Sequence, residues 1–232
     1  MRLARGCAAV AAAAIFVNAA SGQVIPGTRP SQVPGGTTLP MPDEAPATSS
    51  PEKSDKAANK AFKEGMKALD KAKELEAAAA TAPNPDKKAK AMEKLGDEYN
   101  KALDEFTEAL SNKADMVEAW NQVGYVHLRL GAFREALDDY NHALALKPDL
   151  LDAVEHRAEA NLAVDRLDEV KIAYMDLFNH APASAAQLMA AMQKWLAVHQ
   201  SDPSGMRASD VDAFSKWLAE RDGIAKQTAS AQ

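Results

Sequence analysis

Residues 120–127, Trp-Asn-Gln-Val-Gly-Tyr-Val-His, and residues 136–140, Ala-Leu-Asp-Asp-Tyr, decide the fold, because their pattern returns further along the chain. The offset between the copies is 34 residues. The first copy has Trp120, Gly124, Ala136, Tyr140, Ala143 and Pro148, and the second has Val154, Ala158, Val170, Tyr174, Leu177 and Pro182. A period of this length is typical of a solenoid, in which each unit stacks on its neighbour to bury an apolar face. The recurrence therefore predicts a stacked repeat protein.

A partial copy lies upstream of these two. Ala102, Phe106 and Ala109 stand 34 residues before their counterparts in the first copy. Gly65 corresponds to Gly124 of the first copy if the upstream unit has about 25 extra residues between Gly65 and Ala102. The sequence therefore predicts an enlarged first unit over residues 53–112, a long helical hairpin that extends beyond the stack.

Together these residues resemble the tetratricopeptide repeat, whose pattern has Trp, Leu-Gly and Tyr on a first helix and Ala, an aromatic residue, Ala and Pro on a second. Val123 stands in the place of Leu, and His127 in the place of Tyr. The second copy departs further, with Val154 for Trp and Arg157 for Leu. The resemblance covers residues 95–184. It implies an all-α helical solenoid of antiparallel helix pairs that binds or scaffolds other proteins.

The helical periodicity extends the prediction to both sides of the two repeats, which occupy residues 115–184. Glycine and proline are nearly confined to boundaries, and no segment alternates with the period of a strand. Beyond Pro182 the register continues for one more helix, until residues 202–205, Asp-Pro-Ser-Gly, interrupt it. We therefore expect residues 185–227 to form a C-terminal capping hairpin that shields the open end of the stack.

The N-terminal residues 1–22 have the features of a secretory signal peptide. Arg2 and Arg5 precede a short apolar run from Cys7 to Val17, and small residues follow. Cleavage after Ala19 and cleavage after Gly22 both fit. A membrane anchor is the alternative, but the run is short for a hydrocarbon layer of about 30 Å. The segment predicts a periplasmic or secreted protein.

Residues 23–52 are rich in Pro, Gly, Ser and Thr, a composition that cannot bury enough apolar surface to offset its ordering entropy. We expect a disordered leader that serves as a spacer. Recognition of a polyproline segment by a partner is the other interpretation.

Composition excludes several functions. Removal of the signal leaves 25 basic against 33 acidic residues, a formal charge of −8, and no cysteine. Disulfide and thiol chemistry are then absent. Binding of nucleic acid requires an excess of Lys and Arg on one face, which an acidic chain does not predict. After signal removal no remaining segment is long and apolar enough to span a membrane.

Helix boundaries are also readable. Asn84-Pro85 predicts the start of a helix, and Gly131 predicts the left-handed end of another. Asp115 with Glu118 forms the pattern of a capping box, and Asp149 is expected to cap the helix that follows it.

The resemblance places a binding groove on the first helix of each pair. The positions that would line it are Glu118, Asn121, Gln122, Tyr125, Leu128 and Arg129 in the first unit and Asp152, Glu155, His156, Glu159, Leu162 and Ala163 in the second. Asn121 and Tyr125 stand where relatives that grip a peptide carboxylate have Lys and Asn, so this subtype is not expected. Acidic side chains beside Tyr125 favour a basic or neutral segment. The alternative is that these side chains only solvate the groove.

The sequence shows no catalytic, cofactor or metal motif. The five histidines have no ligand spacing, and there is no phosphate loop, nucleophile elbow or zinc helix. The carboxylates, among them Glu155, Glu159 and Asp139, are expected to be solvated. A contact between His127 and His156 remains a hypothesis. Arg157 needs a partner if buried, with Asp138 or Glu135 as candidates.

The sequence thus predicts a binding module without enzymatic activity, which captures a peptide or partner protein of unknown identity along the groove. The second hypothesis is a structural component or assembly factor of an envelope complex that docks through its convex face or terminal hairpin. An enzyme is the third. Oligomeric state is not predicted.

Overall fold

The computed structural model describes residues 51–201 and 206–230, which hold eight helices and no strand. The predicted signal peptide and nearly all of the predicted leader lie outside these residues. The helices are α1 (Pro51–Ala80), α2 (Pro85–Asn112), α3 (Val117–Leu130), α4 (Phe133–Leu146), α5 (Leu151–Ala163), α6 (Leu167–His180), α7 (Pro182–His199) and α8 (Ala208–Ser230). None of these helices combines the length and apolarity needed to cross a membrane.

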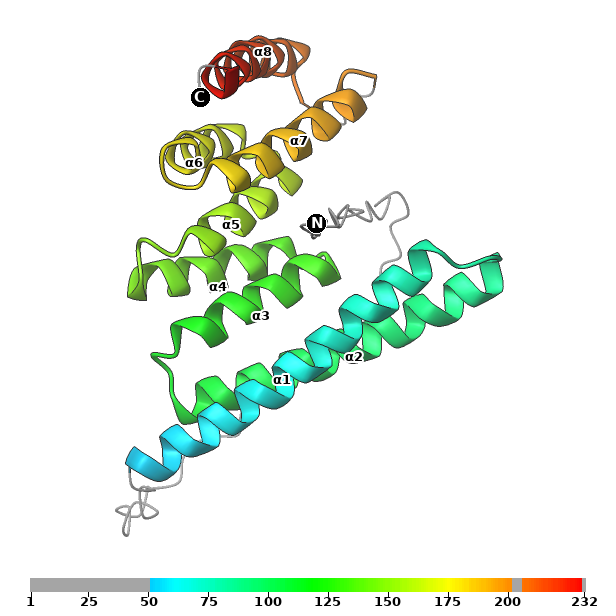
Figure 1. The fold of residues 1–232 in the computed structure, drawn as a ribbon, viewed down its shortest axis with the longest axis vertical. Coiled ribbons are helices and arrows are strands. Elements are labelled where there is room, and N and C mark those ends of the chain that lie inside the picture. The colour runs from blue at the N-terminus through cyan, green and yellow to red at the C-terminus, as the bar shows by residue number, and fades with distance from the viewer. Residues whose placement is uncertain (1–50, 202–205, 231–232) are drawn as a thin grey trace, which may run out of the picture. The chain divides into compact units, whose positions relative to one another are not determined.

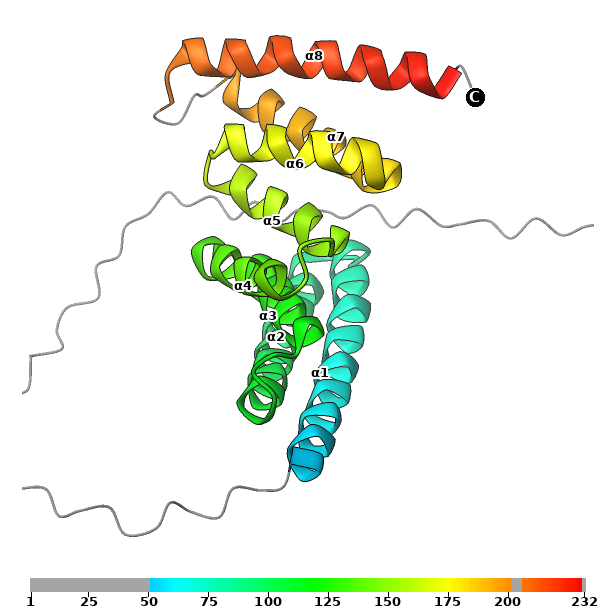
Figure 2. The same cartoon turned by 90° about the vertical axis from the view of Figure 1, so that its left-hand side faces the viewer.

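Consecutive helices pack in antiparallel pairs, and each pair packs on the next (Figure 1). The pairs are α1–α2, α3–α4 and α5–α6. The first helices of successive pairs also touch, since α3 contacts α5, and α5 contacts α7. Helix α8 then packs across α7 and ends the stack (Figure 2). The predicted all-α helical solenoid is confirmed.

The 34-residue period is present in the backbone itself. Helices α5 and α6 begin 34 residues after α3 and α4. The first amide after α2, that of Lys113, donates to Ala109 O at 2.9 Å, and Lys147 after α4 donates to Ala143 O at 2.8 Å. The turns inside the pairs also correspond, because the only two positive φ angles in the described chain, 79° at Gly131 and 60° at Asp165, are one period apart. Repeated side-chain chemistry therefore produces repeated backbone geometry.

Gly124 lets the two helices of one pair approach closely. A Cβ atom built on it would lie 2.8 Å from the ring of Tyr140, a side chain with no solvent exposure. Gly65 on α1 stands in the same relation to Phe106 on α2, at 2.6 Å. This equivalence relates the long α1–α2 hairpin to the α3–α4 pair.

The repeat positions occupy three environments. Gly124, Ala136, Tyr140, Ala143, Ala158 and Tyr174 are buried. Trp120 is half-buried, donates from Nε1 to Ala114 O at 2.8 Å, and stacks on His142 with 4.5 Å between ring centroids. Pro148 and Pro182 are exposed. Pro182 is the first residue of α7, a position whose amide would have no partner within the helix.

Several apolar clusters follow one another along the stack instead of one central core. The largest joins α5 to α8 and contains the buried rings of Tyr174, Trp195 and Phe214. Trp195 also donates from Nε1 to Asp165 at 3.0 Å, which ties the α5–α6 turn to α7. The C-terminal helices thus cover the face that an unfinished stack would expose.

Two predicted helix caps are wrong. The N-cap residue of α3 is Met116 and not Asp115. The N-cap residue of α5 is Leu150 and not Asp149. In both places a tight turn comes first, with the amide of Met116 bonded to Lys113 O and that of Leu150 to Lys147 O, each at 3.2 Å. Met116 is buried, so burial of an apolar residue sets the helix entry. Asn84 does cap α2, through a bond from the amide of Lys87 at 2.9 Å.

Candidate functional site

The predicted groove residues lie on α3 and α5, two inner helices that touch each other. None of the eight binding candidates is fully exposed. Asn121, Glu155 and Leu162 are buried, and Tyr125, Leu128, Arg129, His156 and Glu159 are half-buried. The surface is therefore a packed face with partly covered polar groups.

Three aromatic rings gather where α3, α4 and α5 meet. The ring of His156 lies edge-on to Tyr125, with 5.2 Å between centroids, and is stacked at 6.1 Å on Tyr140. Burial lowers the pKa of His156 and raises that of Tyr125. A neutral imidazole between two phenols gives this face an apolar centre.

Arg129 joins the inner face to the first hairpin. Its guanidinium forms an ion pair with Glu76 of α1, and its Nε donates to the hydroxyl of Tyr99 on α2 at 3.4 Å. Both charged side chains are largely covered, with 17% and 24% of their surfaces exposed. Burial lowers the pKa of Arg129, while the charge of Glu159 opposes this. The long hairpin thus forms one wall of the inner face, which the sequence pattern did not predict.

Two carboxylates lie one turn apart on α5, with Glu159 near Arg129 and Tyr125 and Glu155 near Ser184 of α7. Burial raises the pKa of Glu159 to about 7; the charge of Glu155 adds to the rise, and Arg129 opposes it. Burial also raises the pKa of Glu155, whose residue is 7% exposed. The prediction that these carboxylates are solvated was wrong, because α5 packs between α3 and α7, which cover them.

The remaining candidates belong to the packing more than to an open groove. Leu162 is 4% exposed within the C-terminal core, and Leu128 packs against an apolar cluster formed by α4 and α5. Asn121 is 8% exposed, and its Oδ1 accepts no hydrogen bond from the described residues. The part of the predicted site with chemistry to offer is thus Tyr125, Arg129, Glu155, His156 and Glu159, the inner cluster.

His127 has a partner that the sequence analysis missed. Its Nδ1 lies 2.6 Å from Oδ2 of Asp139, which is 8% exposed. Burial raises the pKa of Asp139, and the hydrogen bond with His127 opposes that rise. The pair links α3 to α4, whereas His156 lies between Tyr125 and Tyr140. The 12-residue spacing was the available signal, since it joins the two sides of one helix pair.

A cleft between α4, α5 and α6, lined by none of the inner cluster, is here named the outer cleft. This outer cleft has a volume of about 770 Å³ and holds Arg157, whose Nη1 donates to Oδ1 of Asn141 at 3.0 Å. Neither Asp138 nor Glu135 pairs with Arg157 in the structure, because Asn141 takes that role. Ile172 lines the cleft with 71% of its surface exposed.

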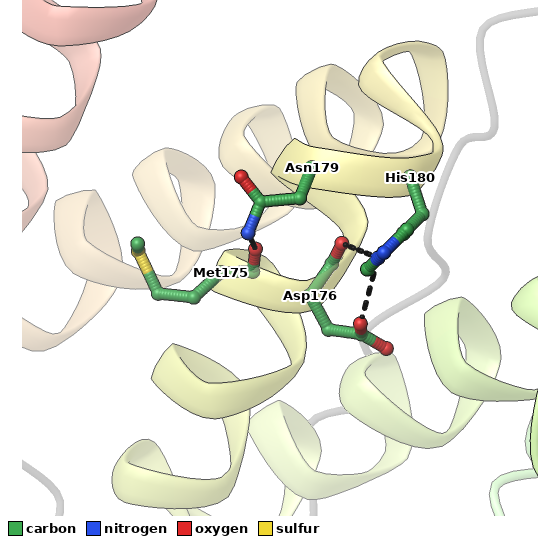
Figure 3. A network of polar contacts seen from close by, with 4 residues as sticks. All are labelled: Met175, Asp176, Asn179 and His180. Carbon is green, nitrogen blue, oxygen red and sulfur yellow. Dashed lines mark hydrogen bonds and ion pairs between the residues drawn. The ribbon is translucent and has the colours of Figure 1, made fainter.

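The carboxylate of Asp176, also on the cleft, is held by His180. Nδ1 of His180 lies 2.9 Å from the carbonyl oxygen of Asp176 and 3.0 Å from its Oδ1 (Figure 3). In the same turn Asn179 donates from Nδ2 to Met175 O at 3.0 Å. These contacts satisfy carbonyl groups at the end of α6 and fix one acidic group at the cleft.

The described residues hold no group of three His, Cys, Asp or Glu side chains that could bind a metal ion. Paired carboxylates are present at Glu155 and Glu159, and the hydroxyl of Ser184 on α7 lies beside Glu155. The surface offers aromatic, amide and charged groups for contact, as an interaction face requires.

Comparison with known proteins gives a family for one segment. Residues 117–150 match the family model of the tetratricopeptide repeat. No curated protein matches the chain. Among solved structures the chain is similar to the complex of the TPR2B domain of yeast Sti1 with pHsp70, at 16% identity and a TM-score of 0.38. It is also similar to the Arabidopsis OM64 TPR domain, at 15% identity and a TM-score of 0.40.

Each likeness covers 72% of this chain and 98% of the other. The α3–α4 pair, with its Trp120, Gly124, Ala136 and Tyr140, coincides with the matched segment. Repeats of this type form surfaces for binding other proteins. The chain is therefore an all-α helical solenoid in which residues 117–150 match the tetratricopeptide repeat.

Proposed function

We propose that this protein is an exported protein–protein interaction module that binds a partner segment on the inner face of α3 and α5. The observation that supports the proposal is the inner cluster, where aromatic rings and two carboxylates lie together on adjoining repeat units. Aromatic side chains with a polar end are enriched where proteins bind each other.

The charges of the inner cluster favour a basic or neutral segment. Arg129 is already paired with Glu76, and a hydrogen bond with Ser184 acts on Glu155, which leaves Glu159 without an ion-pair partner among the described residues. A cationic side chain next to Glu159 would lower its pKa, so binding releases a proton near neutral pH. Affinity for a basic segment is therefore expected to be higher at pH 8 than at pH 6.

Affinity capture with the purified protein tests the site. The double substitution Tyr125→Ala with Glu159→Gln is expected to abolish capture of the partner. The matched control, Ile172→Ser with Glu169→Gln, removes one large apolar and one acidic group from the outer cleft and should retain capture. Retention by the first variant with loss by the second would contradict the inner face.

Export is part of the proposal and depends on residues 1–22. The mature protein is expected in the periplasm or outside the cell, with its N-terminus at Ala20 or Gln23. N-terminal sequencing of the secreted form distinguishes the two. A product that keeps Met1 and fractionates with the cytoplasm would contradict export.

Docking through the outer face in an envelope complex is the second candidate. The observation that favours it is the outer cleft, with exposed Ile172 and the guanidinium of Arg157. Within the described residues no carboxylate lies within ion-pair distance of Arg157. Under this alternative the Ile172→Ser and Glu169→Gln variant is the one that loses its partner.

A further inference from the structure

Five lysines form one line along the surface of α1. Lys53, Lys56, Lys60, Lys63 and Lys67 follow one another at alternating intervals of three and four residues, which places them on one face of the helix. All five are exposed. At 1.5 Å per residue this lysine stripe is about 21 Å long.

Most of the stripe is not neutralised. In the described part of the chain no carboxylate lies within 4.0 Å of Lys53, Lys56, Lys60 or Lys63, while Lys67 pairs with Glu64 at 2.7 Å. The pKa of Glu64 is lowered, first by its hydrogen bond with Lys67 and further by the charges of Lys67, Lys101 and Lys60. A positive field therefore exists on this face of a chain whose formal charge is −6.

Among the described residues, the stripe is exposed and its basic groups are all lysine. The opposite side of α1 is buried on its neighbours through Ala58, Ala61, Ala68, Leu69 and Ala72. No arginine and no large apolar or aromatic residue interrupts the line of lysines. Within the described residues, α1 begins the stack and packs chiefly on α2 (Figure 1).

We propose that the lysine stripe binds the surface of a bilayer that contains anionic lipid. Side chains in line on a single helix can all reach one plane at the same time. A headgroup layer demands charge alone, whereas a protein partner is usually held by aromatic, Arg or apolar anchors, which this face lacks. Nucleic acid is usually recognised through the planar fork of arginine, and the stripe has none.

The size of the effect decides whether an acidic protein can bind in this way. A lysine close to an anionic surface contributes a factor of about five in affinity, so four lysines contribute roughly several hundredfold. At physiological salt the screening length is about 8 Å, so carboxylates on distant helices hardly oppose the contact. The stripe therefore acts as a local binding surface on an acidic chain, independent of the inner cluster.

Cosedimentation of the full chain with vesicles tests the proposal. The vesicles contain phosphatidylcholine with about one third phosphatidylglycerol, and pure phosphatidylcholine vesicles measure any attachment by the apolar N-terminal run. Binding to the anionic vesicles at low salt is expected to exceed binding to the neutral ones by more than tenfold. High salt should remove this excess.

Two variants with the same change of charge identify the surface. Replacing Lys53, Lys56, Lys60 and Lys63 with Gln should lower affinity for the anionic vesicles by roughly several hundredfold. The control variant has Gln in place of Lys88, Lys147, Lys194 and Lys216, four exposed lysines in separate parts of the stack. It should lower the affinity for anionic vesicles by less than about fivefold. Circular dichroism checks that both variants keep their helical content.

Two outcomes overturn the proposal. The first is that the chain binds anionic vesicles no better than neutral ones. The second is that both fourfold variants lose the same affinity for anionic vesicles, which would show an effect of net charge alone. Salt-sensitive binding of the stripe to poly-glutamate without binding to vesicles would point to an acidic protein instead. The Tyr125→Ala and Glu159→Gln variant should bind vesicles as the unaltered chain does, which separates this test from that of the inner face.

Discussion

Close packing of single residues sets the distance between paired helices. Gly124 faces the ring of Tyr140, and Gly65 faces that of Phe106, both without room for a Cβ atom. Gly96 on α2 is different, because nothing lies within 4 Å of the position of its Cβ. The same residue type therefore has opposite roles at these sites.

Substituting these glycines by alanine should change stability in opposite directions. Gly124→Ala gains helix propensity of about 1 kcal/mol, but its Cβ meets a fully buried ring, so we expect a net loss of roughly 1–3 kcal/mol in the free energy of unfolding. Gly96→Ala should gain about 0.5–1 kcal/mol. Urea denaturation measures both. A stabilised Gly124→Ala variant would contradict the close contact.

Glu159 makes stability depend on pH. Its pKa is about 7 in the folded protein and near its ordinary value in the unfolded chain, so the native state holds the proton more tightly between these values. Stability should fall as the pH rises from about 5 to 7 and then level off. Glu159→Gln should remove this fall and be more stable by roughly 1–3 kcal/mol at pH 8. Urea denaturation of both proteins at pH 5 and pH 8 gives the comparison; equal differences at the two pH values would refute it.

Contacts between residues that are distant in sequence hold the helices in place relative to one another. The α1–α2 hairpin is longer than the other pairs, and Arg129 of α3 fastens it through Glu76 and Tyr99. Because both members of the ion pair are mostly covered, their charges interact more strongly than those of a surface pair, and removal of either leaves the other uncompensated. The hairpin is thereby held as a wall of the inner face.

A double-mutant cycle measures this attachment. Arg129→Met and Glu76→Gln should each lower the free energy of unfolding by about 1–3 kcal/mol, because each leaves a partner charge unpaired and largely covered. The double variant should lose less than the sum. The exposed pair Lys67–Glu64, with 71% and 42% of its side-chain surfaces exposed, provides the comparison and should couple by under about 0.5 kcal/mol. Equal coupling energies for the two pairs would contradict a role of Arg129 in holding the hairpin.

At the scale of the whole described unit, stability is distributed along the stack. The cluster that joins α5 to α8 closes its end, and Val211, Phe214 and Leu218 of α8 are buried in it. Repeat stacks lose cooperativity and solubility when their terminal cover is removed. We therefore expect the repeats before α8 to depend on this helix for stability.

Deletion of residues 208–232 should expose the rings of Tyr174 and Trp195 to water. Loss of three buried apolar side chains is expected to cost roughly 5 kcal/mol, seen as a lower melting temperature and as binding of a hydrophobic dye. Deletion of residues 224–232 is the control, since most of the described side chains it removes are exposed. Its effect should stay below about 1 kcal/mol. Similar melting temperatures for the two deletions would contradict the covering role.

Much of the fold was predictable because the same types of side chain return at a fixed interval of 34 residues. Gly131 and Asn84-Pro85 were read correctly, since the backbone conformation at each depends on neighbouring residues alone. Asp115 and Asp149 were misread, because burial of Met116 and tight turns outweighed a favourable cap. The covered state of Glu155 and Glu159 was also missed, since a helical pattern does not reveal how closely the next helix approaches.

The sequence by itself determined the all-α repeat architecture, because helical periodicity, small residues at close contacts and a 34-residue interval are local properties of the chain. Only the tertiary structure decided which polar groups share an environment. The ion pair of Arg129 with Glu76 and the burial that raises the pKa of Glu159 arise when separate helices pack. Electrostatic and desolvation energies depend on distance and covering in space, which the order of residues does not contain.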